Sequence, residues 1–198
     1  MSTKGGRPRG FDRDAALAKA TEVFWRHGYE ATSMRALTEV LGIQPPSLYA
    51  AFGNKRQLFD HVVAHYQESN QPVMERALRE PATAQKAIER LLRQLADDYT
   101  DPAHPPGCLV ISAAVNCSPA SADVEEELRA QREVGKQAIV DRIAADVSSG
   151  LLPPDTDAAA LGTFYAAVIQ GMSTQSRDGA SRTELHAIAD AAMRSWLS

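Results

Sequence analysis

Two consecutive prolines stand between two glycines in a segment that reads G-I-Q-P-P-S-L-Y-A-A-F-G, residues 42–53. A proline breaks the interior of a helix but fits its first turn, where a backbone N–H has no partner to lose. Gln44 precedes a proline, which pushes it away from helical backbone angles, so it is a candidate cap. We therefore expect a short helix from about Pro45 to Phe52, closed by Gly53.

Capping residues and apolar spacing predict further helices on both sides of this one. Asp12 is a candidate N-cap of a first helix, whose apolar residues recur three or four positions apart until Gly28. Ser33 is a candidate N-cap of a second helix, about eight residues long, that stops at the next glycine. Asn54 with Gln57 forms the capping-box pattern that opens another helix. This order of helices is typical of a helix-turn-helix unit, which binds DNA. The alternative is a plain helical bundle, in which hairpins with glycine turns also occur.

The residues that open the third helix are candidates to contact DNA bases. In helix-turn-helix units the N-terminal residues of the second short helix enter the major groove. Here these residues are Gln44, Pro45, Pro46 and Ser47. Gln and Ser can hydrogen-bond base edges, and a proline ring can pack on a thymine methyl group. Because two prolines leave few donors, we expect specificity to depend on Gln44, Ser47, methyl contacts and DNA shape.

Charge is unevenly distributed along the chain. The net charge of −4 divides into +3 over residues 1–60 and −7 over residues 61–198, which indicates that the N-terminal end meets a polyanion. Residues 1–10 carry Lys4, Arg7 and Arg9 and no apolar residue after Met1, so we expect a flexible basic arm. Such arms contact DNA, which makes Arg7 and Arg9 candidate contacts. The alternative is a solvated terminus and an ordinary fluctuation of charge.

Residues 20–59 resemble the DNA-binding domain of TetR-family transcriptional regulators. The matching blocks are G-Y-x-A-T-S at residues 28–33, L-Y-x-x-F at residues 48–52, and the lysine that opens the following helix. The resemblance implies that Tyr49 and Lys55 contact DNA phosphates, and that Ser33 and Arg35 are placed to touch the backbone too. The alternatives are a half-buried core aromatic for Tyr49 and a solvated charge for Lys55. The rest of the chain matches only in being helical and of the expected length.

The whole chain is expected to be all-α. Hydrophobic residues make up 44% of its 198 residues, and no alternating strand pattern persists. We expect a basic arm at 1–10, a three-helix helix-turn-helix DNA-binding domain at 11–60, and a helical ligand-binding and dimerisation domain at 61–198. No apolar run approaches the roughly 20 residues of a membrane span. Two cysteines without a signal-peptide pattern favour a cytoplasmic protein with no membrane partner.

The last two predicted helices carry wide apolar faces. The stripe within residues 158–172 is too broad for one neighbour, and residues 185–196 repeat it more weakly. The resemblance implies the same pairing, in which two helices from each copy form a homodimer that binds a palindromic double-stranded DNA operator. The candidate interface residues are Leu161, Tyr165, Val168, Ile169, Leu185, Ile188, Ala192 and Trp196. The alternative is a thick monomeric core.

The resemblance also implies a small-molecule effector that binds the C-terminal domain and releases DNA. The candidate pocket residues are Tyr99, Cys108, Cys117, Phe164 and Met172, with simple core packing as the alternative for each. We therefore expect a ligand-responsive repressor with an unidentified effector, no cofactor, no metal site and no catalytic residue.

Two other hypotheses use the cysteines. Cys108 and Cys117 could form the switch of a redox-responsive regulator, although only His104 lies nearby in sequence to stabilise a thiolate. A thiol enzyme would pair Cys108 with His104, but the apolar surroundings of Cys108 argue against an exposed nucleophile. No metal-ligand spacing and no phosphate-binding glycine loop favours another kind of enzyme. A helical dimer that only scaffolds would leave the basic arm and the helix-turn-helix pattern unexplained.

Overall fold

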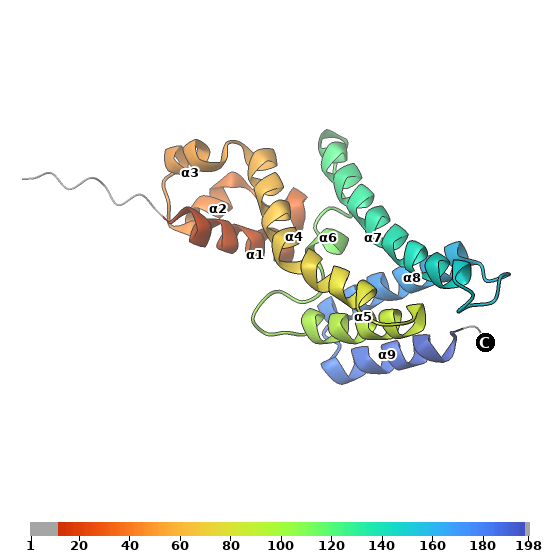
Figure 1. Ribbon diagram of the computed structural model, residues 1–198. Coiled ribbons are helices and arrows are strands. Elements are labelled where there is room, and N and C mark those ends of the chain that lie inside the picture. Colours follow the sequence, from red (N-terminus) through yellow and green to blue (C-terminus); the bar gives the residue numbers. More distant parts are fainter. Residues whose placement is uncertain (1–11, 197–198) are drawn as a thin grey trace, which may run out of the picture.

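The computed structural model describes residues 12–196, which form helices and connecting loops and contain no strand (Figure 1). The helices are α1 (Arg13–Ala31), α2 (Met34–Leu41), α3 (Pro45–Phe52), α4 (Lys55–Arg79), α5 (Ala84–Tyr99), α6 (Leu109–Ser112), the 3-10 helix η1 (Pro119–Ser121), α7 (Ala122–Ser148), α8 (Ala158–Arg177) and α9 (Arg182–Arg194). The expected all-α class is confirmed for this part of the chain. Within it, no helix is long and apolar enough to cross a membrane.

The N-terminal helices begin where their capping residues predict. The side chain of Asp12 accepts hydrogen bonds from two backbone N–H groups of the first turn of α1, and Ser33 Oγ accepts one in α2. Asn54 and Gln57 form both halves of the capping box at the start of α4. Pro45 opens α3, and its bounds match the expected helix. We call α1, α2, α3 and the first turns of α4 the head.

Aromatic rings fix the positions of the helices in the head. The Phe59 ring of α4 meets the rings of Phe24 and Tyr29 edge-to-face, with centroid distances of 5.1 and 5.0 Å. Leu37 of α2 and Leu48 of α3 are fully buried in the same core. The helix α2 packs on α1, α3 packs on α4, and the two short helices pack on each other. An isolated helix of this length needs such contacts in order to be stable in water.

A glycine interrupts α1 close to its end. Gly28 has φ 78° and ψ 169°, a backbone conformation that essentially only glycine adopts, and the helix resumes to Ala31 beyond the end that the sequence predicts. A Cβ atom at Gly28 would lie 3.2 Å from the carbonyl oxygen of Ala113, in the segment after α6. The next residue, Tyr29, donates its N–H to that oxygen at 2.6 Å. Gly28 thus allows the head to approach the chain that follows α6.

Replacing Gly28 with alanine is expected to lower the free energy of unfolding by about 1–3 kcal/mol, because alanine is strained in this conformation. Urea unfolding of the purified protein measures the loss. Gly135→Ala is the matched control, since nothing lies within 4 Å of the added Cβ in the middle of α7. That variant is expected to gain about 0.5–1 kcal/mol. Equal effects of the two substitutions would contradict the role of Gly28.

The long helix α4 connects the head with the remaining helices, which we call the body (Figure 1). In the body α5 packs on α8 and α9, and α7 lies along α8. The boundary expected between residues 60 and 61 falls inside α4, which continues to Arg79. The core of the head also includes Leu109, Val124 and Leu128 from the segment of α6 and α7. Head and body therefore share a helix and part of a core.

Half of the residues predicted to form the dimer interface are buried in the core of a single protomer. Tyr165 is fully buried, and its hydroxyl donates to the carbonyl oxygen of Ala192 at 3.1 Å. Ile169 and Leu185 are buried in the same core, so these four residues face α5, α8 and α9 rather than a second copy. The others are partly buried at the edge of this core: Leu161, Val168, Ile188 and Trp196. The stripe on α8 is broad because α5, α7 and α9 all pack against this helix.

Candidate DNA-binding helix and effector cavity

The leading edge of α3 is exposed to solvent. Gln44, Pro45, Pro46 and Ser47 are all exposed, while Leu48, the next residue, is fully buried. Gln44 is the N-cap of α3 but makes no side-chain capping hydrogen bond, so its carboxamide remains available to a partner. The structure therefore brings the four predicted base-contact residues together on one accessible surface.

The predicted backbone contacts lie around the same helix. Tyr49 of α3 is 50% exposed, and in α2 Arg35 is exposed and pairs with Glu39 through a 3.0 Å contact. The exposed Ser33 accepts the N–H of Ala36 at 3.1 Å, which uses one lone pair of its hydroxyl and leaves the proton free to donate. Helix N-termini of this kind favour phosphate oxygens.

Lys55 has protein contacts that the sequence does not reveal. Its Nζ donates to the carbonyl oxygen of Glu30 at 3.3 Å and lies 4.2 Å from the centroid of the Tyr29 ring. Partial burial lowers the pKa of Lys55 from its ordinary value, against the opposing effect of Glu30. An ammonium has three donors, so Lys55 can hold the end of α1 and still donate to a phosphate.

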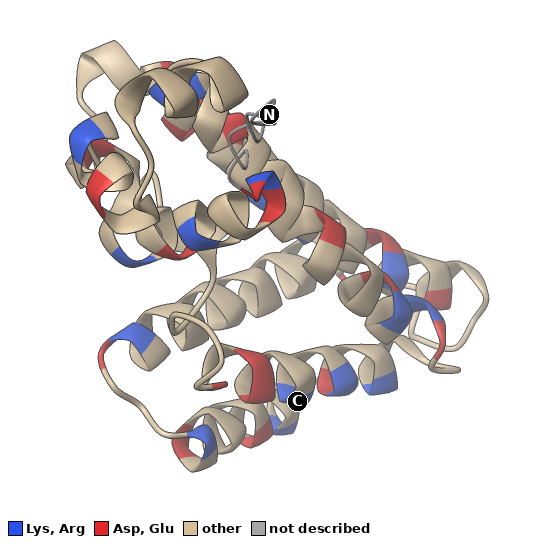
Figure 2. Cartoon of the chain, turned by 90° about the vertical axis from the view of Figure 1, so that its left-hand side faces the viewer, with Lys and Arg blue, Asp and Glu red and all other residues tan. Residues whose placement is uncertain are grey.

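Charges of both signs alternate over the head (Figure 2). Residues 12–60 contain six Lys or Arg and six Asp or Glu, so this segment is neutral. The charge of +3 assigned to residues 1–60 therefore resides in the first eleven residues. The candidate contacts Arg7 and Arg9 belong to that segment and lie outside the described residues.

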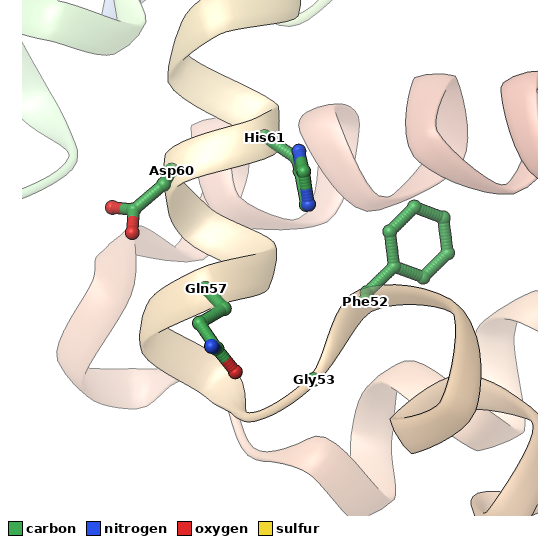
Figure 3. A pocket seen from close by; sticks show the side chains of 5 residues that line it. All are labelled: Phe52, Gly53, Gln57, Asp60 and His61. Carbon is green, nitrogen blue, oxygen red and sulfur yellow. The ribbon is translucent and has the colours of Figure 1, made fainter.

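A shallow depression lies where α3 meets α4 (Figure 3). It is lined by Phe52, Gly53, Gln57, Asp60 and His61. The rings of Phe52 and His61 turn toward each other, with centroids 6.0 Å apart, and the guanidinium carbon of Arg13 lies 4.7 Å from the Phe52 centroid. Gln57 is occupied in the capping box. These side chains hold α3 against its neighbours, and we assign them a structural role.

A cavity of about 390 Å³ lies between α4, α5, α6, α7 and α8. Its walls are mostly apolar, and its volume falls in the range of small-molecule sites in proteins. The apolar side chains of the lining are those of Met74, Leu78, Leu95, Val110, Val134, Ala138, Ile111, Ile139, Ala166 and Ile169. The cavity is the main candidate for an effector site in the described part of the chain.

Two of the five predicted pocket residues, Tyr99 and Cys108, line this cavity. The other three lie elsewhere. Met172 is fully buried in the core of the body, and Phe164 is exposed on α8. Cys117 packs against the core of the head, because the chain after α6 returns toward α1.

Tyr66 and Arg132 also line the cavity but are not among the pocket residues predicted from the sequence. In sequence, Tyr66 has the spacing of an ordinary core aromatic, and Arg132 resembles a solvated charge on a long helix. Neither residue carries a local signal of a cavity.

The two thiol hypotheses gain no support from the geometry. The thiol of Cys108 accepts a hydrogen bond from the Tyr66 hydroxyl at 3.3 Å, and burial raises its pKa. His104 directs Nδ1 at Pro105 O, at 2.9 Å, and Nε2 at Asp98, at 3.5 Å. Partial burial also raises the pKa of Cys117. Both thiols are thus held protonated, which opposes nucleophilic and redox chemistry.

Hydrogen bonds connect the walls of the cavity with the head. The segment after α6 receives the N–H of Tyr29, as described above, and Arg177 of α8 donates to Trp25 O and Ser112 Oγ, both at 3.1 Å. On the other side, Arg56 of α4 pairs with Asp123 and Glu127 at the start of α7. A displacement of α6, α7 or α8 by a ligand would therefore act directly on the head.

Comparison with known proteins decides the family. Two family models match the chain, one described as bacterial regulatory proteins of the tetR family over residues 16–62 and one as a tetracyclin repressor-like C-terminal domain over residues 84–192. The chain belongs to the TetR family. The helix-turn-helix of a DNA-binding regulator of transcription, expected from residues 20–59, is thereby confirmed.

Several transcriptional regulators are similar over nearly the whole chain. The transcriptional repressor ComR of Escherichia coli K12 is 36% identical over 192 residues, which cover 96% of this chain and 91% of ComR. The repressor BdcR of the same organism is 30% identical, covering 93% of this chain and 88% of BdcR. A solved structure of a cysteine mutant of the regulator CifR with 26-base-pair operator DNA matches with 41% identity and a TM-score of 0.91, covering 96% of this chain and 100% of that chain.

Proposed function

We propose that this TetR-family regulator represses transcription by binding a palindromic operator as a homodimer, and that a small molecule in the cavity releases it. The observation that carries the proposal is the exposed edge of α3 on a head that is hydrogen-bonded to the cavity wall. ComR and BdcR, which are named repressors, and CifR, solved with operator DNA, support it by similarity. We place the protein in the cytoplasm, where chromosomal DNA is accessible, and assign it no catalytic activity.

The exposed face of α8 is suited to a dimer interface. No Lys, Arg, Asp or Glu occurs in α8 before Arg177. Phe164 is 42% exposed at the middle of this face, with the small residues Ala160, Ala167 and Gly171 exposed along it. Small residues allow two helices to approach closely, and an exposed aromatic side chain supplies apolar area for burial. We therefore propose that this exposed face of α8 forms the dimer interface. The buried residues Tyr165, Ile169, Leu185 and Ala192, which the sequence suggests, do not.

Release of DNA follows from the connections between cavity and head. A two-fold dimer presents two α3 helices to successive major grooves, and their separation must match the operator. A ligand that binds better to a dimer with a different separation lowers operator affinity by that difference in binding free energy. The contacts of Tyr29 with the segment after α6, and of Arg56 with α7, transmit the shift of the cavity walls to the head.

The proposal predicts salt-dependent, sequence-specific binding to a palindrome in the promoter region of the chain's own gene. Fluorescence anisotropy with that palindrome, a single half-site and a scrambled duplex measures it at several salt concentrations. The palindrome is expected to bind at least about a thousandfold more tightly than the scrambled duplex. Equal affinity for palindrome and scrambled DNA would overturn the proposal.

The dimer is tested separately by Phe164→Glu, which places a charge at the centre of the proposed interface. We expect this variant to sediment as a monomer at concentrations where the unchanged protein is a dimer, and to lose its preference for the palindrome over the half-site. Thr183→Glu, at an exposed position near the start of α9, is the control and is expected to remain dimeric. A dimeric Phe164→Glu variant would show that the interface lies elsewhere.

A further inference from the structure

One charged side chain in the cavity lining forms no ion pair. Arg132 of α7 donates from Nη1 to the carbonyl oxygen of Val110 at 2.9 Å, and none of the ion pairs among residues 12–196 includes it. Partial burial lowers the pKa of Arg132 from its ordinary value, against the opposing attraction of Glu125, which reflects the cost of holding this charge away from water. A guanidinium has five N–H donors, so most of them remain for a ligand.

The other charged groups of the lining are compensated within the protein. Lys136 pairs with Glu133 at 2.6 Å, and Asp98 is faced by His104 at 3.5 Å. Glu75 pairs with Arg79 at 3.9 Å and accepts a hydrogen bond from Gln71 at 2.9 Å. Arg132 is therefore the charge that a ligand can satisfy, and its planar fork of donors suits the two oxygens of a carboxylate.

The shape of the wall along α7 separates a polar end from an apolar end. The polar end is formed by Gln131 and Arg132, which both line the cavity. From Gln131 to Ile139 the wall extends about 12 Å along the helix axis. Apart from Lys136, which pairs with Glu133, the lining residues after Arg132 are apolar or glycine: Val134, Gly135, Ala138 and Ile139. Gly135, midway along it, leaves the space open, since nothing lies within 4 Å of where its Cβ would stand. These features fit a ligand with a polar group at Arg132 and a hydrocarbon chain of medium length that extends toward Ile139.

We propose that the cavity binds an amphipathic monocarboxylate, with the carboxylate on Arg132 and the chain along the apolar wall toward Ile139. The inference names the chemical class of the effector and so rests on the proposed function. Because a carboxylate is attracted to an unpaired, partly buried cation, an acid is expected to bind more tightly than an alcohol or an amine of equal length.

Calorimetric titration of the full-length protein without DNA tests the proposal, with octanoate, 1-octanol and octylamine as probes. Octanoate is expected to bind about tenfold to a hundredfold more tightly than octanol, which is the range for a hydrogen bond to a charged group. Octylamine is expected to bind more weakly than octanol. No binding of octanoate, or equal binding of octanoate and octanol, would overturn the proposal.

Three variants locate the binding. Arg132→Gln is expected to remove the preference for octanoate while octanol still binds, and Gly135→Leu is expected to weaken both probes by filling the cavity. Arg129→Gln is the matched control, because Arg129 lies one turn earlier on α7, is exposed and pairs with Glu126. Loss of octanol and octanoate alike in Arg132→Gln, or an equal loss of preference in Arg129→Gln, would contradict the assignment.

Failure of this inference can be distinguished from failure of the proposed function. If the operator palindrome is bound specifically but octanoate is not preferred, the regulator stands and the ligand class is wrong. If octanoate is preferred but no palindrome is bound, the site stands and the proposed function fails.

Discussion

Replacing Tyr49 with phenylalanine is expected to weaken operator binding about a hundredfold. The side chain of Tyr49 is 50% exposed on α3, beside the four residues that we propose as base contacts. A hydrogen bond from its hydroxyl to a phosphate is worth about 1.5–3 kcal/mol. Because a homodimer makes the contact twice, even the lower value gives about 3 kcal/mol, or roughly a hundredfold in affinity. Anisotropy titration of the operator palindrome measures the change.

The same titrations separate phosphate contacts from base contacts. Tyr49→Phe is expected to weaken operator and scrambled DNA by similar factors, since a phosphate carries no sequence information. Gln44→Ala is expected instead to change the ranking of operator variants. Tyr165→Phe is the matched control, because it removes a hydroxyl buried in the body. Unchanged operator affinity in Tyr49→Phe would show that this hydroxyl makes no contact.

The head could be predicted because its signals are local. Asp12, Ser33 and Asn54 satisfy N–H groups within three residues of themselves, and Gly42 ends α2 with φ 67°. Such rules depend on a few neighbouring residues and not on the rest of the fold. The start of α3 at Pro45 followed from the same reasoning. The break of α1 at Gly28 was harder, because its reason is the approach of Ala113 from a distant part of the chain.

The cavity and the proposed dimer surface could not be predicted in the same way. The cavity lies between five helices, so whether Met172 or Tyr66 faces it depends on packing that no local pattern encodes. On α8 the adjacent residues Phe164 and Tyr165 are both aromatic, yet one is exposed and the other is fully buried. Apolar spacing shows that a helix is covered on several sides, but not which side is covered by its own chain.

A large loss of stability is expected from a substitution where the end of α7 contacts the start of α5, two helices that line the cavity. Asp146, near the end of α7, is only 3% exposed and accepts the N–H of Ala84, the first residue of α5, at 2.6 Å. It also pairs with Arg142, whose Nε donates to the carbonyl oxygen of Leu78 at 3.1 Å. Asp146→Ala leaves the Arg142 charge partly buried without a counter-charge and the Ala84 N–H without an acceptor. We expect the free energy of unfolding to fall by about 3–5 kcal/mol.

At a fixed protein concentration this loss corresponds to a decrease of about 10 °C in the midpoint of thermal unfolding. Asp146→Asn separates the two contributions, because the amide oxygen can still accept from Ala84 while the charge is absent, so a smaller loss is expected. Asp141→Ala, at an exposed position five residues earlier on α7, is the control and is expected to stay within about 0.5 kcal/mol of the unchanged protein. Equal losses in Asp146→Ala and Asp146→Asn would assign the stabilisation to the ion pair. A loss in Asp146→Ala no larger than that of the control would show that neither contact holds α5 on α7.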